Sequence, residues 1–366
     1  MAPWSRLIAL FAVVGMASAC AGPATSQLSG PAASAEPTVS IVTQLPRSAR
    51  GIAVAPDGTV YLEQRGCLTW SDNSGYGSEP PEVLKLTKGA KLVTIAGLAC
   101  GFGGDGGPAT RAKFHMLSGM VLDHAGNLFL ADLFNDRIRE ITSQGRVSTV
   151  AGSGPVTDDG AANDLFGGDG GPASRALLAR PAALAIDAHG VLYVADQWNN
   201  RVRKVTPDGR ISTVAGTGVR GSAGDAGPAT AAQLWYPEAL AVNAAGDLFI
   251  ADQGGTSLRV VDSHGTIATV TASSYAGAPA AALHFSQILA LAVGPDQSLF
   301  IGDSGQGQVF RLAPDRSSLD GMMNSGWRCP GTCKDFRPNG LAFDSAGNLY
   351  VVDTGDRTLI KLTWKT

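Results

Sequence analysis

Aspartate recurs at one position of the chain's internal repeats, and carboxylates are groups that bind metal ions and exchange protons. Each one ends an apolar run such as LFLAD or LYVAD, and together they are Asp132, Asp196, Asp252, Asp303 and Asp353. A residue that returns in five units is best explained by a task that every unit shares. We therefore expect an Asx-type turn, or an ion pair with Arg137, Arg201 or their counterparts, and keep ligand contact as the alternative.

Aromatic and amide residues in the expected loops are the candidates for binding. They are Trp70, Tyr76, Phe134, Asn135, Trp198, Asn199, Trp235 and Tyr236. Exposed aromatic rings among amides and carboxylates are typical of surfaces that bind partners, and loops carry such sites. This composition predicts recognition of a protein, a peptide or a glycan rather than a reaction.

A catalytic or metal-binding set is not evident in the sequence. His124, His189 and His264 fall in hairpin turns, whereas His115 and His284 precede the first strands of two different repeats, so no three of them point at the axis. No serine, histidine and aspartate form a credible triad. Three GDGGPA-like loops carry Asp105, Asp169 and Asp225, whose glycines and prolines favour turns. We expect no cofactor and no metal, with calcium in these carbonyl-rich loops as the alternative.

The repeats themselves predict the fold. Each unit contains an apolar run, a turn of the type D-x-x-G-N, a second apolar run, a polar turn, an alternating strand such as RIREI, a glycine turn and a last strand such as VSTVAG. That is four antiparallel strands per unit, and a single four-stranded sheet cannot bury both faces alone. Six units predict an all-β, six-bladed β-propeller over residues 38–366. The last unit lacks a strand, so we expect Val39 to Leu45 to pair with it and close the ring.

These repeats resemble the NHL-repeat family, and the GDGGPA-like loops resemble those of its bacterial members and of the teneurin propeller. The resemblance implies the fold but is weak for function, because the family contains binding modules, lyases and sensor domains. Strand order places the loops between strands 2 and 3 and between units on one face, which we call the loop face. The sequence places the GDGGPA loops and the aromatic candidates there, and only short hairpin turns on the opposite face.

Cysteine spacing predicts two disulfides. Cys67 and Cys100 lie in loops that emerge on the same face, whereas Cys329 and Cys333 lie in one CPGTC turn. The spacings do not resemble a zinc site. The pairs expected are therefore Cys67–Cys100 and Cys329–Cys333.

The first residues resemble an export signal. Residues 1–19 combine Arg6 with the apolar run LIALFAVV, and Cys20 follows small residues as in a bacterial lipobox. Residues 20–37 are rich in small residues and proline, which predicts a flexible tether. We expect an exported protein, either lipid-anchored through Cys20 or secreted, that contacts the membrane only through that lipid.

Bulk charge excludes one class of partner. The formal net charge is −3, and lysines and arginines are not clustered. Nucleic-acid binding is therefore not expected. We expect a monomeric, non-catalytic binding or scaffold module at the cell envelope. A metal-dependent hydrolase or lyase that uses carboxylates in the propeller channel is the alternative.

Overall fold

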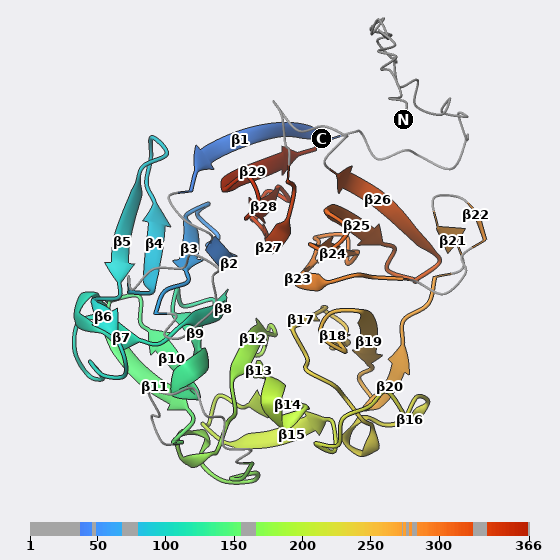
Figure 1. The fold of residues 1–366 in the computed structure, drawn as a ribbon, viewed down its shortest axis with the longest axis horizontal. Helices are drawn as coiled ribbons and strands as arrows, with labels where there is room; N and C mark the ends of the chain where they lie inside the picture. The colour runs from blue at the N-terminus through green and yellow to red at the C-terminus, as the bar shows by residue number, and fades with distance from the viewer. Residues whose placement is uncertain are drawn as a thin grey trace, which may run out of the picture.

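Six sheets surround a central axis in the computed structural model, each with its first strand innermost (Figure 1). The structure describes residues 37–45, 49–67, 80–154, 166–272, 274–275, 278–279, 284–324 and 335–364. The expected all-β, six-bladed propeller of four-stranded antiparallel blades is confirmed. No helix in these ranges is long and apolar enough to cross a membrane. Cys20, Cys329, Cys333, Trp70 and Tyr76 lie outside the described residues, as do the expected signal peptide and all but the last residue of the tether.

The blades follow one another along the chain. Blade 1 contains β2 (Ala49–Val54), β3 (Val60–Gln64), β4 (Glu82–Leu86) and β5 (Leu92–Ala96). Blade 2 contains β8 (Leu117–Leu122), β9 (Leu128–Asp132), β10 (Arg137–Ile141) and β11 (Val147–Ala151). Blade 3 contains β12 (Pro181–Ile186), β13 (Leu192–Asp196), β14 (Arg201–Val205) and β15 (Ile211–Ala215).

The second half of the ring repeats this order. Blade 4 contains β17 (Ala239–Val242), β18 (Leu248–Asp252), β19 (Ser257–Val261) and β20 (Thr266–Thr269). Blade 5 contains β23 (Ile288–Val293), β24 (Leu299–Asp303), β25 (Gln308–Leu312) and β26 (Ser318–Asn324). Blade 6 contains β27 (Pro338–Phe343), β28 (Leu349–Asp353), β29 (Thr358–Thr363) and β1 (Thr38–Gln44).

Short elements occupy the connections between strands. The short strands are β6 (Ala99–Cys100), β7 (Lys113–Phe114), β16 (Gly227–Pro228), β21 (Ser274–Tyr275) and β22 (Ala278–Pro279). The 3₁₀ helices are η1 (Ala109–Arg111), η2 (Leu133–Asn135), η3 (Ala173–Arg175), η4 (Gln197–Asn199) and η5 (Ala229–Ala231).

The hydrophobic core lies between neighbouring blades. Each second strand carries branched residues on one face, and side chains such as Leu130 and Ile250 are completely buried. One cluster joins Val202 of blade 3 to Leu240 and Ile250 of blade 4. Burial therefore comes from blade-to-blade packing, as expected for sheets that cannot cover both faces alone.

The N-terminal strand lies beside the C-terminal one. β1 pairs antiparallel with β29, with Val39 opposite Leu362 and Ile41 opposite Ile360. The chain then turns inward at Leu45, which is buried and donates its backbone N–H to the carbonyl of Arg357 at 2.7 Å. In the sheet order β1-β29-β28-β27, β1 is the outer strand of blade 6.

The GDGGPA loops lie along the outer edge of the blade that follows them. In the loop before blade 2, Gly106 donates its N–H to the carbonyl of Val147, and Ala109 donates to that of Gly145, each at 2.8 Å. Equivalent bridges join Pro172 to Arg210 in blade 3. Their assignment to the loop face was therefore wrong: the backbone groups of each exposed outer strand draw the loop to the edge of the sheet.

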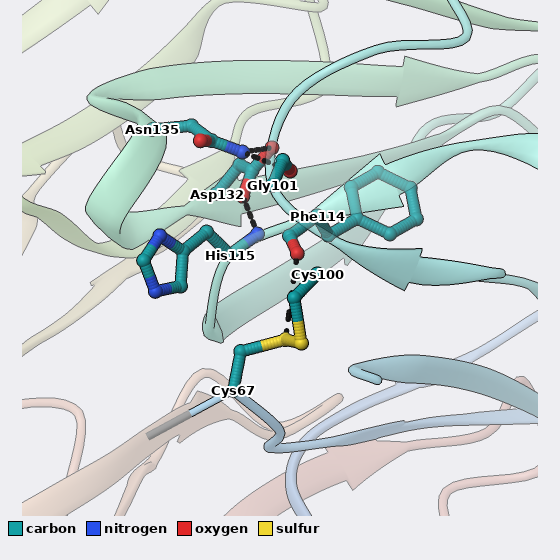
Figure 2. Close-up of a disulfide and its surroundings, with 7 residues drawn as sticks. All are labelled: Cys67, Cys100, Gly101, Phe114, His115, Asp132 and Asn135. Carbon is teal, nitrogen blue, oxygen red and sulfur yellow. Dashed lines mark hydrogen bonds between the residues drawn. A yellow bond between two sulfur atoms is a disulfide. The ribbon is translucent and has the colours of Figure 1, made fainter. Parts of the chain in front are cut away.

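A disulfide joins Cys67, just after β3, to Cys100, in the connection to blade 2 (Figure 2). This is the pairing expected from the two loops. The Cα atoms are 5.7 Å apart, a distance that a disulfide spans readily. Cys67 is buried. Because its partner lies in the connection to blade 2, the disulfide fastens blade 1 to the start of blade 2.

Candidate functional site

The repeated aspartates hold the loops that lead into the inner strands. Asp132 accepts the N–H of His115, Asp196 that of Ala179 and Asp252 that of Trp235, each at 2.7 Å. Asp303 and Asp353 accept equivalent N–H groups from Gln287 and Arg337, both at 2.9 Å. All five carboxylates are completely buried. The shared structural task expected of them is therefore visible in every blade that carries one.

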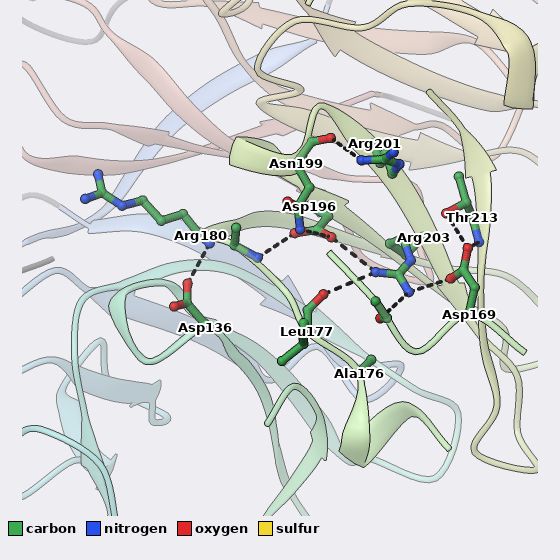
Figure 3. A network of polar contacts seen from close by, with 12 residues as sticks. Asp136, Asp169, Ala176, Leu177, Arg180, Asp196, Asn199, Arg201, Arg203 and Thr213 are labelled. Atoms are coloured by element: carbon green, nitrogen blue, oxygen red, sulfur yellow. Dashed lines mark hydrogen bonds and ion pairs between the residues drawn. The ribbon is translucent and has the colours of Figure 1, made fainter. Parts of the chain in front are cut away.

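Each of three arginines connects a repeated aspartate to a GDGGPA-type loop. In blade 3, Arg203 contacts Asp196 at 3.3 Å and Asp169 of the loop (Figure 3). Arg139 and Arg259 make the same two contacts in blades 2 and 4. Burial nevertheless raises the pKa of Asp132, Asp196 and Asp252 to about 6.

These pairs correct two expectations. The expected partners were Arg137 and Arg201, but those side chains donate to backbone carbonyls, including that of Asn199 at 3.0 Å from Arg201. The arginine two residues later lies on the same face of the strand and is the one that contacts the aspartate, as Arg139 does with Asp132 and Arg203 with Asp196. Asp169, in a loop where calcium was the alternative, binds this buried arginine and accepts the N–H of Thr213 at 3.1 Å.

A second type of hydrogen bond holds two of these loops to the preceding blade. Asp136 of blade 2 accepts the N–H of Arg180 at 2.7 Å (Figure 3). Asn200 of blade 3 likewise accepts the N–H of Tyr236 at 3.1 Å. Arg180 and Tyr236 have positive φ angles, 47° and 51°, in the left-handed region. The loops are thus fixed from two blades at once, which holds an unfavourable backbone conformation in place.

These loops create a continuous row of rings and guanidinium groups on the loop face, which we call the aromatic–arginine band. It consists of Phe134, Arg180, Trp198, Arg220, Trp235 and Tyr236. Arg180 lies 3.7 Å from the ring centre of Trp198 and 4.8 Å from that of Phe134. Tyr236 is 6.3 Å from Trp198 and 6.4 Å from Trp235. The band spans blades 2, 3 and 4.

The band is accessible at one end and partly covered along its length. Trp235 is 42% exposed and Arg220 is exposed, whereas Phe134, Trp198 and Tyr236 are half-buried. Guanidinium groups over aromatic faces are attracted by the rings and still offer their N–H edges to an acceptor. This arrangement can bind carboxylates next to apolar or aromatic groups.

Two of the amides expected at this surface belong to the fold instead. Asn135 is completely buried and donates to Gly101 and Asp132 (Figure 2). Asn199 donates to Asp196 at 2.9 Å (Figure 3). Their assignment to the binding surface was therefore wrong, because their amide N–H groups donate hydrogen bonds to buried carboxylates. Arg180 and Arg220 belong to the band but were not singled out from the sequence, because a single arginine in a loop carries no repeat signal.

Beside the band, a salt bridge crosses the entrance to the propeller channel. Arg50 of blade 1 lies 2.9 Å from Glu238 of blade 4, and Gln197 donates to the other oxygen of Glu238 at 2.7 Å. A cavity of about 70 Å³ lies at this entrance, lined by residues from the first half and middle of the inner strands together with Glu238. It has room for little more than ordered water. At this entrance, Arg50 and Gln197 thus bind Glu238 from other blades across the channel.

Glu63 is the most unusual carboxylate near the channel. It is completely buried, neither oxygen forms a hydrogen bond within the described chain, and burial raises its pKa to about 7. Weaker attraction from Arg65, Arg50 and the backbone of Gly51 opposes this shift. A Cβ at position 51 would lie 2.6 Å from the carboxyl carbon of Glu63, so glycine leaves the necessary space. Glu63 occupies a position where other repeats have a small or apolar residue, a signal that our sequence analysis missed.

The described residues contain no group of three or more histidine, cysteine, aspartate or glutamate side chains placed to hold a metal ion. His115 is buried and packs edge-on against Phe134 at 5.1 Å. His124 and His189 are exposed in turns on the face opposite the band.

Comparison with known proteins agrees with the repeats. The model of the teneurin NHL domain matches residues 217–282. Human Teneurin-4 is 34% identical over 144 residues, which cover 36% of this chain and 5% of the relative. The chloroplastic protein SUPPRESSOR OF QUENCHING 1 of Arabidopsis thaliana is 31% identical over 136 residues, which cover 37% of this chain and 12% of the relative. The matched region thus spans only a small part of these relatives.

Solved structures show the same fold at low identity. Virginiamycin B lyase from Staphylococcus aureus superposes with a TM-score of 0.54 over 90% of this chain and 100% of the lyase, at 14% identity. A gluconolactonase-like protein superposes with a TM-score of 0.55 over 90% of this chain and 92% of its own, also at 14% identity. Both likenesses concern the propeller architecture alone.

Proposed function

We propose that this chain, an NHL-repeat β-propeller, is a non-catalytic binding module whose aromatic–arginine band takes up an acidic segment of a protein or peptide. The observation that carries the proposal is the alternation of rings and guanidinium groups along one row. Aromatic residues and arginine are the side chains that contribute most to binding energy at interfaces. The band is also rigid, since aspartates from two blades fix its loops, and rigid sites lose less entropy on binding.

An acidic peptide fits the band better than a glycan does. A sugar ring stacks on a free aromatic face, but the guanidinium of Arg180 already covers Trp198 at 3.7 Å. Arg220 likewise lies 4.6 Å from the ring centre of Tyr236. The N–H edges of the exposed Arg220 match carboxylates, which guanidinium binds with two parallel hydrogen bonds. Apolar side chains of the same segment would contact Trp235.

The test uses a labelled peptide of alternating glutamate and tyrosine, with a counterpart that has lysine in place of glutamate. Fluorescence anisotropy should show binding of the acidic peptide only. Replacement of Arg220 or Trp235 by alanine should weaken it about fivefold, the loss of an interaction of about 1 kcal/mol. Arg175→Ala, an exposed arginine outside the band, is the control and should bind as the wild type does.

Three other results would reject the proposal. Equal binding of the acidic and basic peptides would show that the guanidinium groups do not select the ligand. Binding of neutral oligosaccharides, lost in Trp235→Ala, would make the band a glycan site. Turnover of a lactone or ester by the purified protein, lost in Glu238→Gln, would favour the hydrolase or lyase that was the alternative.

We further propose that the pairing of β1 with β29 closes the ring, and that the module works outside the cytoplasm, attached through a lipid on Cys20. The closure is supported by the antiparallel register between Thr38 and Gln44 and the C-terminal strand. The location rests on the sequence of residues 1–20. A propeller tethered by its N-terminus would carry its band away from the membrane on a polar linker.

A further inference from the structure

A second cavity opens on the face opposite the band. Its volume is about 740 Å³, within the range of small-molecule sites, and it lies where the inner strands of blades 2 to 6 end. The sequence indicated only short hairpin turns on this face. Each turn is indeed short, but five of them together border one cavity around the propeller axis.

The floor of this cavity is apolar. It is formed by the residues that end the inner strands, namely Leu122, Ile186, Val242, Val293 and Phe343. All five are only half-buried, although the residues two positions earlier in these strands, such as Leu184 and Leu240, are buried. Apolar surface that faces a cavity gains free energy when an apolar group displaces its water.

The rim of the cavity is acidic. Asp123, Asp187 and Asp344 stand at the start of three turns, and no arginine or lysine is among the lining residues. Lys361 lies 3.4 Å from Asp344 and neutralises that carboxylate in part. Asp123 and Asp187 accept hydrogen bonds from their own turns and form no ion pair within the described chain. Two uncompensated negative charges therefore face the mouth of an apolar cavity.

We propose that this cavity binds a small molecule with an apolar body and one ammonium group. The body occupies the floor between Ile186 and Phe343, and the ammonium group lies at the rim near Asp123 and Asp187. Charge complementarity selects the cation, because an anion would approach the same two carboxylates at short range. This site is separate from the aromatic–arginine band and does not depend on the function proposed for it.

Calorimetric titration with three matched probes tests the proposal: phenylbutylamine, phenylbutanol and phenylbutyrate. All three titrations are done in the same buffer at about pH 8, where the amine is a cation and the acid an anion. The amine should bind, the alcohol should bind more weakly, and the acid should bind at least about tenfold more weakly than the amine. Equal affinity for amine and acid would overturn the proposal.

Variants locate the binding and separate the two contributions. Ala188→Trp places a large ring at the mouth and should abolish binding, whereas Ala346→Trp, in an equivalent turn but outside the lining, should leave it unchanged. Replacing both Asp123 and Asp187 by asparagine should weaken the amine about tenfold but not the alcohol. Asn243 already stands at this turn position in blade 4 and accepts the N–H of Asp247 at 2.8 Å, so the turns should persist.

Two outcomes would contradict the assignment. Binding of the amine that survives Ala188→Trp would place it elsewhere on the protein. Binding that is lost in Trp235→Ala, on the opposite face, would assign the amine to the band and remove the evidence for a second site. Retained binding in Trp235→Ala, together with loss in Ala188→Trp, supports the cavity.

Discussion

Replacing Glu63 by glutamine should stabilise the propeller at neutral pH and leave its stability unchanged in acid. Burial raises the pKa of Glu63 from an ordinary value of 4.5 to about 7. Between these two pH values the folded protein keeps a proton that the unfolded chain has released. The free energy of unfolding therefore falls as the pH rises through this window, by about 3 kcal/mol at about 1.36 kcal/mol per pH unit.

Glutamine resembles the protonated acid in shape and cannot ionise. The variant should consequently exceed the wild type by up to about 3 kcal/mol above pH 7, and the difference should vanish toward pH 4.5. Urea unfolding followed by tryptophan fluorescence across this range measures the gap directly. The comparison of two proteins at each pH cancels the titration of every other group, including the four repeated aspartates with raised pKa values.

Glu140→Gln supplies the matched control, since Glu140 is a half-exposed strand residue whose partner is Ser148. A gap between wild type and Glu63→Gln that is constant from acid to neutral pH would refute the reasoning, because it would show that Glu63 ionises alike in the folded and unfolded chains.

Three further predictions concern the frame and the location of the module. Arg203→Met should lower the free energy of unfolding by about 3–5 kcal/mol in urea titrations, because it leaves Asp196 buried without its cation; a loss below about 1 kcal/mol would contradict this role. Deletion of residues 1–45 should lower the urea midpoint, and a peptide of residues 37–45 should restore it if β1 closes the ring; no effect of the deletion would reject closure. Cys20→Ser should release the protein from the membrane fraction into the medium, as an immunoblot would show, and continued membrane association would reject the lipid anchor.

The architecture could be predicted because the same pattern of strands and turns occurs in six units of the sequence. The turn residues, the alternating strands and the missing outer strand of the last unit are all local patterns. The placement of the GDGGPA loops could not be predicted in this way. These loops lie along an edge because they donate hydrogen bonds to backbone carbonyls at the start of the outer strand, such as those of Gly145 and Val147. These carbonyls lie some 40 residues further along the chain.

The same limit applies to the candidate sites. The sequence indicated the aromatic members of the band, since large rings in loops are visible as residue types. It did not indicate Arg180, whose place beside Trp198 depends on the hydrogen bond that its backbone N–H, in the left-handed region, donates to Asp136 of the preceding blade. Nor did it indicate the apolar cavity, because residues such as Ile186 follow the same pattern as buried strand residues. Only the geometry of the ring exposes them.

Departures from the repeat are therefore better guides to function here than the repeat itself. The turn after the second strand carries Phe134 in blade 2 and Trp198 in blade 3, but Gly254, Gly305 and Gly355 occupy this position in blades 4 to 6. Glycine suffices for the turn, so the fold does not require an aromatic residue there. The rings of Phe134 and Trp198 are half-buried and stand where other blades have glycine. They therefore add apolar surface that the fold does not need. This asymmetry confines the band to one side of a nearly symmetric ring, which is the side where a partner should be sought.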